Sequence, residues 1–234
     1  GISGRIYSEK YSNNVTGLRE NTTQTTRYGA LVRYRFALNA PTLSVNIQNQ
    51  ERTNKLESGA SGRIDENTRT IGFGLSHNFK FVEGRHNIRL DWNKTERNNN
   101  VNQSNRSKGE TITIKLTSNW TRGFRFETQY GVTRNKYPEL NRRTDLARFT
   151  VRASYKPVGG KYNTWVRWQQ ADSNGSENYF NSNRDTLEFG MEWDLGEGMT
   201  LEASISVSDF NDNRASDNNF HETMYRIILM RLLD

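Results

Sequence analysis

The sequence predicts an all-β protein: a single domain over residues 1–234, built as one antiparallel, up-and-down sheet of about twelve strands. Two observations carry this prediction. Apolar and polar residues alternate with a period of two in segment after segment, which is typical of strands with one apolar face. The connections between these segments are short and long in turn, as they are in a series of hairpins. The chain contains 3 Pro, which leaves long regular strands possible.

The first half of the chain contains six of the predicted strands. The clearest covers residues 28–38, where Tyr28, Val32 and Phe36 share one face and Arg33 lies on the other. Residues 1–11 alternate poorly and are nevertheless included as a strand. The remaining four cover residues 43–48, 71–79, 88–93 and 112–120.

The second half of the chain contains the other six strands. In residues 187–195, Leu187 and Phe189 point to one face and Glu188 to the opposite face. Residues 165–168 carry aromatic side chains on both faces and are still assigned to a strand. The remaining four cover residues 124–133, 147–156, 201–208 and 225–233.

The connections fall into two classes that alternate along the chain. The long ones are rich in Asn, Ser and Asp, and the short ones carry the Gly, Pro and Asn that tight turns need. The long connections cover residues 12–26, 54–65, 98–108, 136–144, 173–183 and 211–221. The short turns cover residues 39–41, 80–83, 121–123, 157–160 and 196–198. In an antiparallel sheet this alternation places all the long connections at one end.

Composition excludes several classes of protein. Only 32% of the residues are hydrophobic and the mean hydropathy is −0.93, which is too polar for an ordinary globular core. The aromatic share of 11% argues against disorder. No apolar run is long enough for a transmembrane helix, and without Cys there is no disulfide or Cys-based metal site. Residues 1–10 lack the layout of a signal peptide, so we expect a mature chain.

Strand length and the two faces of the strands favour a membrane-spanning barrel. A strand of about 12 residues is roughly 40 Å long, which spans the hydrocarbon layer when it is tilted by about 45°. Strands of globular proteins average about 5–6 residues. Aromatic residues near the strand ends of the apolar face suit the two membrane interfaces. These aromatics are Trp92, Trp120, Phe124, Tyr155, Tyr162 and Trp193.

On these patterns the chain resembles bacterial outer-membrane β-barrels, and in particular the small porin-like ones, over almost its whole length. The resemblance implies a transmembrane barrel in the outer membrane of a Gram-negative bacterium, with lipid against the apolar face and a lumen lined by the polar face. It further implies passive diffusion of small hydrophilic solutes, with no cofactor.

Charges on the polar face predict a preference for anions. Basic residues dominate the first nine strands, a short acidic group follows, and the net charge of the chain is +7. Rings of Arg and Lys in a pore favour anions. We expect the pore to be lined by Arg33, Arg89, Lys115, Arg152, Arg167, Glu188, Glu192, Glu202 and Arg226.

Two alternatives stay open. A barrel of about twelve strands lies between filled and open sizes, so the same charges could close the lumen. The barrel would then be a structural anchor that docks a partner protein in its lumen or on its loops. The other alternative is a soluble antiparallel assembly whose edge strands pair with neighbouring molecules.

No enzymatic, metal or nucleic-acid site is expected. Ser76 and His77 are adjacent in a strand and point to opposite faces, so they cannot act as nucleophile and base together. His221 stands near acidic residues, which leaves an Asp–His pair open. Asp212 and its neighbours match no calcium-binding loop. The basic residues face away from the aromatic ones, whereas binding of single-stranded nucleic acid needs both on one surface.

Overall fold

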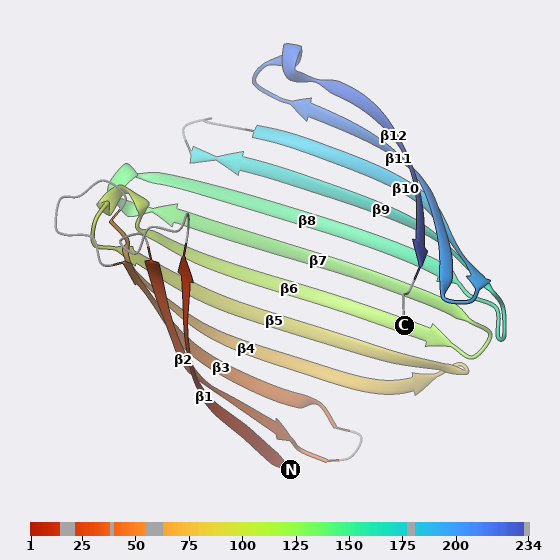
Figure 1. Cartoon of the computed structure of the whole chain (residues 1–234), viewed down its shortest axis with the longest axis horizontal. Helices are drawn as coiled ribbons and strands as arrows, with labels where there is room; N and C mark the ends of the chain where they lie inside the picture. The colour runs from red at the N-terminus through yellow and green to blue at the C-terminus, as the bar shows by residue number, and fades with distance from the viewer. Residues whose placement is uncertain (15–21, 38–39, 55–62, 177–180, 232–234) are drawn as a thin grey trace. The chain divides into compact units, whose positions relative to one another are not determined.

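The computed structural model describes residues 1–14, 22–37, 40–54, 63–176 and 181–231. Consecutive strands are neighbours in one antiparallel sheet, in the order β1 to β12 (Figure 1). This confirms the all-β, up-and-down arrangement of twelve strands. The strands are β1 (Ile2–Asn14), β2 (Thr22–Arg35), β3 (Thr42–Asn54), β4 (Asp65–Phe81), β5 (Gly84–Asn99), β6 (Ser107–Trp120), β7 (Phe124–Tyr137), β8 (Arg142–Tyr155), β9 (Tyr162–Gly175), β10 (Asn181–Gly196), β11 (Met199–Asp212) and β12 (Phe220–Arg231). Within the described residues, three 3-10 turns lie between strands: η2 (Gln103–Asn105), η3 (Pro138–Leu140) and η5 (Ser216–Asn218).

The strands extend further into the polar connections than the alternation predicts. β10 begins at Asn181 rather than near Leu187, and Asn181 pairs with Asn174 of β9. A long connection was predicted at 136–144, but only η3 and Asn141 lie between the end of β7 and the start of β8. Asn141 ends the turn with a left-handed φ of 48°. The cause is that ladder hydrogen bonds join backbone groups and continue where both faces carry polar side chains.

Contacts within the chain define two units. The first contains residues 1–76, 90–112 and 133–144, and the second contains residues 77–89, 113–132 and 145–234. Within each unit, the pairing of neighbouring strands decides which side chains share a face.

In the first unit, the register aligns apolar side chains of β1 to β4 on one face. Val32 of β2 lies opposite Val45 of β3, which in turn lies opposite Phe73 of β4. Ala30 and Ile47 form the next such pair toward the long connections. The predicted apolar face is therefore continuous across these strands.

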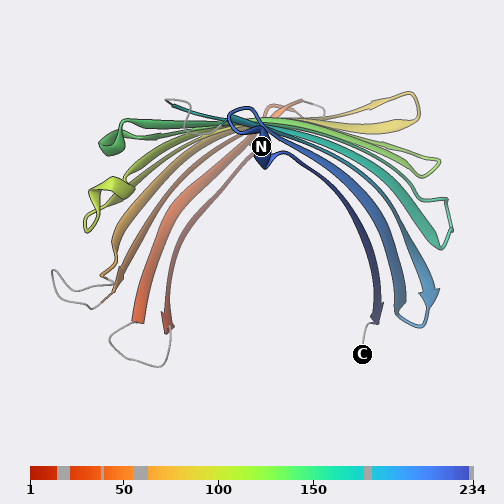
Figure 2. The ribbon, with the colours of Figure 1, turned by 90° about the horizontal axis from the view of Figure 1, so that it is seen from above.

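The second unit repeats this arrangement in β9 to β12. Phe189 of β10 lies between Val166 of β9 and Ile205 of β11, and Ile205 lies opposite Tyr225 of β12. Figure 2 shows β11 and β12, in blue, running side by side and bending together. Two of the aromatic residues predicted near strand ends lie opposite each other, Trp193 of β10 and Tyr162 of β9.

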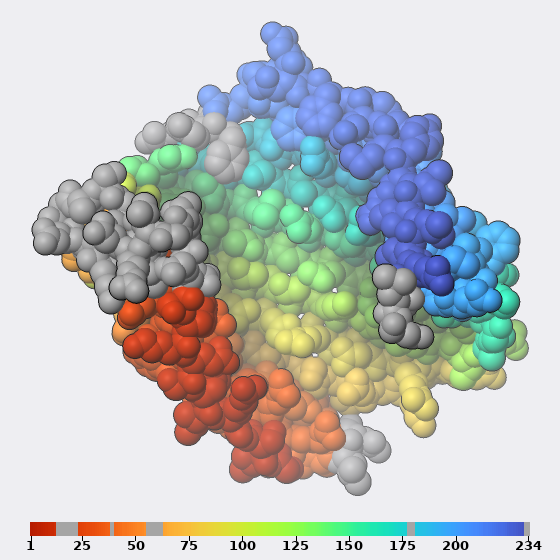
Figure 3. Space-filling model, viewed as in Figure 1, coloured from red at the N-terminus to blue at the C-terminus, as the bar shows by residue number. Residues whose placement is uncertain are grey.

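Burial is inverted relative to that of a soluble domain. Within the described part of the chain, no apolar residue is buried to the degree of a core residue. Apart from glycines, the buried residues are polar, His86 and Ser118 among them, whereas Phe189 is 51% exposed and Ile227 is 76% exposed. Figure 3 shows β11 and β12 at the molecular surface. An apolar face of this extent requires an apolar surrounding, as in a membrane barrel.

The short turns are tight hairpin connections. Val82 and Glu83 join β4 to β5 with φ values of 42° and 53°, as a two-residue turn with positive φ requires. His86 braces this turn from the start of β5. Its Nε2 donates to the Phe81 carbonyl oxygen at 2.9 Å, and its Nδ1 lies 2.9 Å from the Ser118 hydroxyl oxygen.

No helix in the described residues is long and apolar enough to cross a membrane.

Candidate functional site

The polar face combines long basic side chains with small residues on the neighbouring strands. In the first unit, Arg33 of β2 lies opposite Ser44 of β3, and Ser44 lies opposite Gly74 of β4. A side chain added at Gly74 would meet the Ser44 hydroxyl oxygen at 2.5 Å. The glycine therefore makes room for the Ser44 hydroxyl, which donates to the Gly74 carbonyl oxygen at 3.3 Å.

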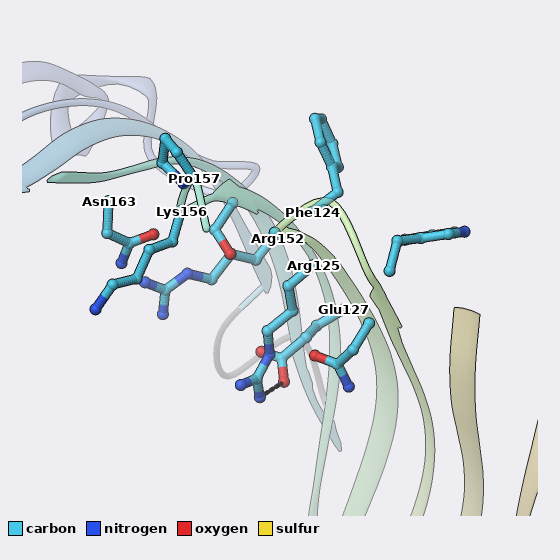
Figure 4. Close-up of a pocket in the computed structure, with 11 residues that line it drawn as sticks. Phe124, Arg125, Glu127, Arg152, Lys156, Pro157 and Asn163 are labelled. Atoms are coloured by element: carbon cyan, nitrogen blue, oxygen red, sulfur yellow. Dashed lines mark hydrogen bonds and ion pairs between the residues drawn. The ribbon is translucent and has the colours of Figure 1, made fainter. Parts of the chain in front are cut away.

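The second unit contains a polar pocket of about 530 Å³ on the same kind of face, close to the short turns (Figure 4). We call it the basic pocket. In Figure 4 the side chains of Arg125, Arg152 and Lys156 project to one side of the sheet, and Phe124 points away from them. Its polar lining residues are Asn119, Arg125, Glu127, Arg152, Ser154, Lys156 and Asn163.

Positive charge exceeds negative charge in the basic pocket. Glu127 accepts a bond of 2.5 Å from Arg125 Nη2 and lies 3.5 Å from Nζ of Lys115. Together with Arg152 and Lys156, which line the pocket, this cluster contains four cations and one carboxylate, for a formal charge of +3. Among the described residues, neither Arg152 nor Lys156 forms an ion pair.

An aromatic ring positions Arg152. The guanidinium carbon of Arg152 lies 5.4 Å from the centre of the Trp165 ring, within the range of a cation–π interaction. Trp165 lies opposite Gly190 of β10, and a side chain at Gly190 would overlap the indole. The glycine thus makes room for Trp165, which in turn supports Arg152. The alternation pattern did not identify Trp165; its signal was the aromatic residue on the polar face of residues 165–168.

Two pairs of the expected pore-lining residues are brought together by the register. Arg167 of β9 forms an ion pair with Glu188 of β10, whose side chain is 16% exposed. Glu192 of β10 lies directly opposite Glu202 of β11.

The other expected residues take separate positions. Lys115 joins the basic pocket through Glu127, and Arg226 of β12 lies opposite Ser204. Arg33 belongs to the first unit, and Arg89 lies in β5 in the second.

The long-connection end carries ordered polar contacts. His221 is part of β12 rather than of a loop, and its Nδ1 lies 2.6 Å from an Asp209 carboxylate oxygen. Both side chains are more than half exposed, at 62% and 58%. At the end of β11, past its last pair with β12, the Asn218 amide and the backbone N–H of Arg214 lower the pKa of the Asp212 carboxyl.

Comparison with known proteins identifies solved structures with a similar fold. No protein-family model and no curated protein matches the sequence. Among solved structures, the siderophore receptor PirA from Acinetobacter baumannii matches with a TM-score of 0.63 and 11% identity, over 100% of this chain and 41% of that one. PirA from Pseudomonas aeruginosa gives a TM-score of 0.58 at 13% identity, over 99% and 40%. The ferric enterobactin receptor PfeA from Pseudomonas aeruginosa, as the Q482A mutant, gives 0.60 at 13%, over 100% and 42%.

The likeness shows that the fold is that of a bacterial outer-membrane β-barrel. The chain spans less than half the length of these receptors. All of them are bacterial outer-membrane proteins, which supports the outer-membrane location that the sequence predicts.

One prediction from the sequence is corrected by the comparisons. We expected a protein without enzymatic activity, but the neighbours also include OmpT, an outer-membrane protein of Vibrio cholerae, at 8% identity and a TM-score of 0.43. A likeness of this degree neither assigns nor excludes an activity. The firm exclusion of catalysis is therefore withdrawn.

Proposed function

We propose that this chain forms the wall of an outer-membrane channel for small hydrophilic solutes and that it favours anions. The observation that carries the proposal is the basic pocket, where four cations and a single carboxylate lie together on the polar face. In a membrane barrel that face borders the lumen, because the apolar face is in contact with lipid.

The arrangement of charges in the pocket suits conduction better than tight binding. Glu127 holds Arg125 and Lys115, so these two cations are partly neutralised. Arg152 and Lys156 supply the uncompensated charge, and only Arg152 is braced by an aromatic ring. A passing anion is attracted but meets no closed cage, which is the condition for permeation rather than capture.

Single-channel recording tests the proposal. The protein is inserted into a planar bilayer with a tenfold KCl gradient, and the reversal potential is measured. We expect discrete current steps and a reversal potential closer to the equilibrium potential of chloride than to that of potassium. A reversal potential closer to the equilibrium potential of potassium would refute the proposal.

A second candidate is supported by the pairing of Arg167 with Glu188. Ion pairs between neighbouring strands of a lumen can fill a barrel of intermediate size and leave no path for ions. The protein would then act as a structural anchor for a partner. Insertion into the bilayer without current steps would support this second function and refute the first.

A further inference from the structure

A second charged cluster lies on the apolar face, at the edge of its apolar band. In the first unit, Tyr28, Asn49 and Arg69 stand directly opposite one another on β2, β3 and β4. This row follows the row of Ala30 and Ile47, one step closer to the long connections. The apolar face therefore changes to polar at this level while still facing away from the lumen.

The cluster encloses a shallow depression with an apolar floor. Its volume is about 510 Å³, and Ile47, which is 46% exposed, lies among polar residues that include Arg69 and Glu96. Asn49 donates from Nδ2 to the Tyr28 hydroxyl oxygen at 2.5 Å, which fixes one wall. An aliphatic chain can contact Ile47 while a polar group reaches the charged residues above it.

Three cations lie in or beside this depression, and one of them, Arg69, lines it. Lys94 Nζ lies 3.1 Å from a Glu96 carboxylate oxygen. Arg69 and Lys108 are also close enough to act on Glu96 electrostatically. Arg69 and Lys108 are exposed, and Glu110 of β6 is a second carboxylate on this face.

An aromatic residue marks the same level as a membrane interface. Trp92 of β5 shares a face with Glu96, and its indole Nε1 donates to Glu110 of β6 at 2.7 Å. Trp and Tyr with a polar tip gather where hydrocarbon meets headgroups. Trp92 and Tyr28 therefore place Arg69, Lys94 and Lys108 at headgroup depth.

We propose that this depression binds the phosphate group of a membrane lipid in the leaflet on the side of the long connections. Arg69 and Lys108 contact the phosphate oxygens, and an acyl chain passes over Ile47. Basic pockets at this depth are suited to anionic headgroups because both charge and apolar surface are matched. The proposal depends on the barrel fold and is independent of which solutes cross the lumen.

Lipid retention in detergent tests this site. The purified protein is titrated with phosphatidic acid, which exposes a phosphate monoester, and separately with phosphatidylcholine of the same acyl chains. Bound lipid is counted by native mass spectrometry. We expect at least tenfold tighter retention of phosphatidic acid, and at least a fivefold loss of that retention in both Arg69→Ala and Lys108→Ala.

The matched control is Arg122→Ala, which removes one exposed cation from the turn between β6 and β7, at the short-turn end. It should retain phosphatidic acid as the unmodified protein does. Equal retention of both lipids, or an equal loss in all three variants, would overturn the proposal. Displacement of bound phosphatidic acid by an equimolar amount of inorganic phosphate would overturn the assignment to a lipid, because the free ion would then suffice.

Discussion

Charge reversal at the basic pocket should convert an anion preference into a cation preference in graded steps. Lys156→Glu lowers the formal charge of the cluster from +3 to +1, and the addition of Arg152→Glu brings it to −1. Lys156 is exposed, so its substitution leaves packing unchanged. Arg152→Glu also removes the contact with Trp165 and serves as the stronger, second step.

The size of the effect follows from the size of the pocket. A volume of about 530 Å³ corresponds to a sphere with a radius of about 5 Å, so the charged groups lie roughly 8 Å from its centre. In water each unit charge at that distance contributes about 0.5 kcal/mol, which screening at 0.1 M salt reduces to about 0.25 kcal/mol. Four units of charge then disfavour an anion by about 1 kcal/mol and favour a cation equally. The ratio of anion to cation permeability should fall about thirtyfold in the double variant.

The assay is the reversal potential of single channels in a KCl gradient, measured for the unmodified protein and for the two variants. Lys10→Glu is the matched control, because it makes the same change of charge as Lys156→Glu on the apolar face of β1. Its reversal potential should equal that of the unmodified protein. A double variant that conducts with an unchanged reversal potential would refute the idea that the basic pocket sets selectivity.

Three further predictions concern stability, each measured as the temperature at which the folded form is lost in detergent. Gly190→Val should lower this temperature by several degrees, because its side chain would overlap Trp165; an unchanged value would show that the indole can move freely. Glu188→Gln should cost about 1 kcal/mol, since Arg167 loses its partner but is 45% exposed and can be hydrated; a loss several times larger would point to a filled lumen. Val82→Asn should stabilise the β4–β5 turn by about 1 kcal/mol, because Asn tolerates positive φ and Val does not; a lower transition temperature would contradict this.

The sequence predicted strands well where their two faces differ in polarity. The segment Leu187–Leu195 shows this, because every second residue is apolar and its pairing with β11 follows the expected face. The preceding residues, from Asn181 to Thr186, lay outside the predicted strand, and residues 181–183 were assigned to a long connection. Their side chains are polar on both faces, so no period of two is visible, although the backbone ladder continues through them.

The candidate site was predicted less completely than the strands. Alternation placed Arg152 and Lys115 on the polar face, but it does not specify which residues of neighbouring strands lie opposite one another. That depends on register, which turn geometry and backbone pairing set. The role of Glu127 between Lys115 and Arg125, and of Trp165 beneath Arg152, could be found only once the strands were aligned.

The order of the strands also bears on how such a protein can change over evolutionary time. Each strand of the sheet is flanked by its neighbours in the chain, so two strands and their turn form a self-contained piece. Duplication or loss of one such piece keeps every remaining strand in its direction and every long connection on its original side. The register within the remaining pairs is also preserved, because it is fixed locally by each turn. A wall of this kind can widen or narrow its lumen in steps of two strands without redesign of the rest.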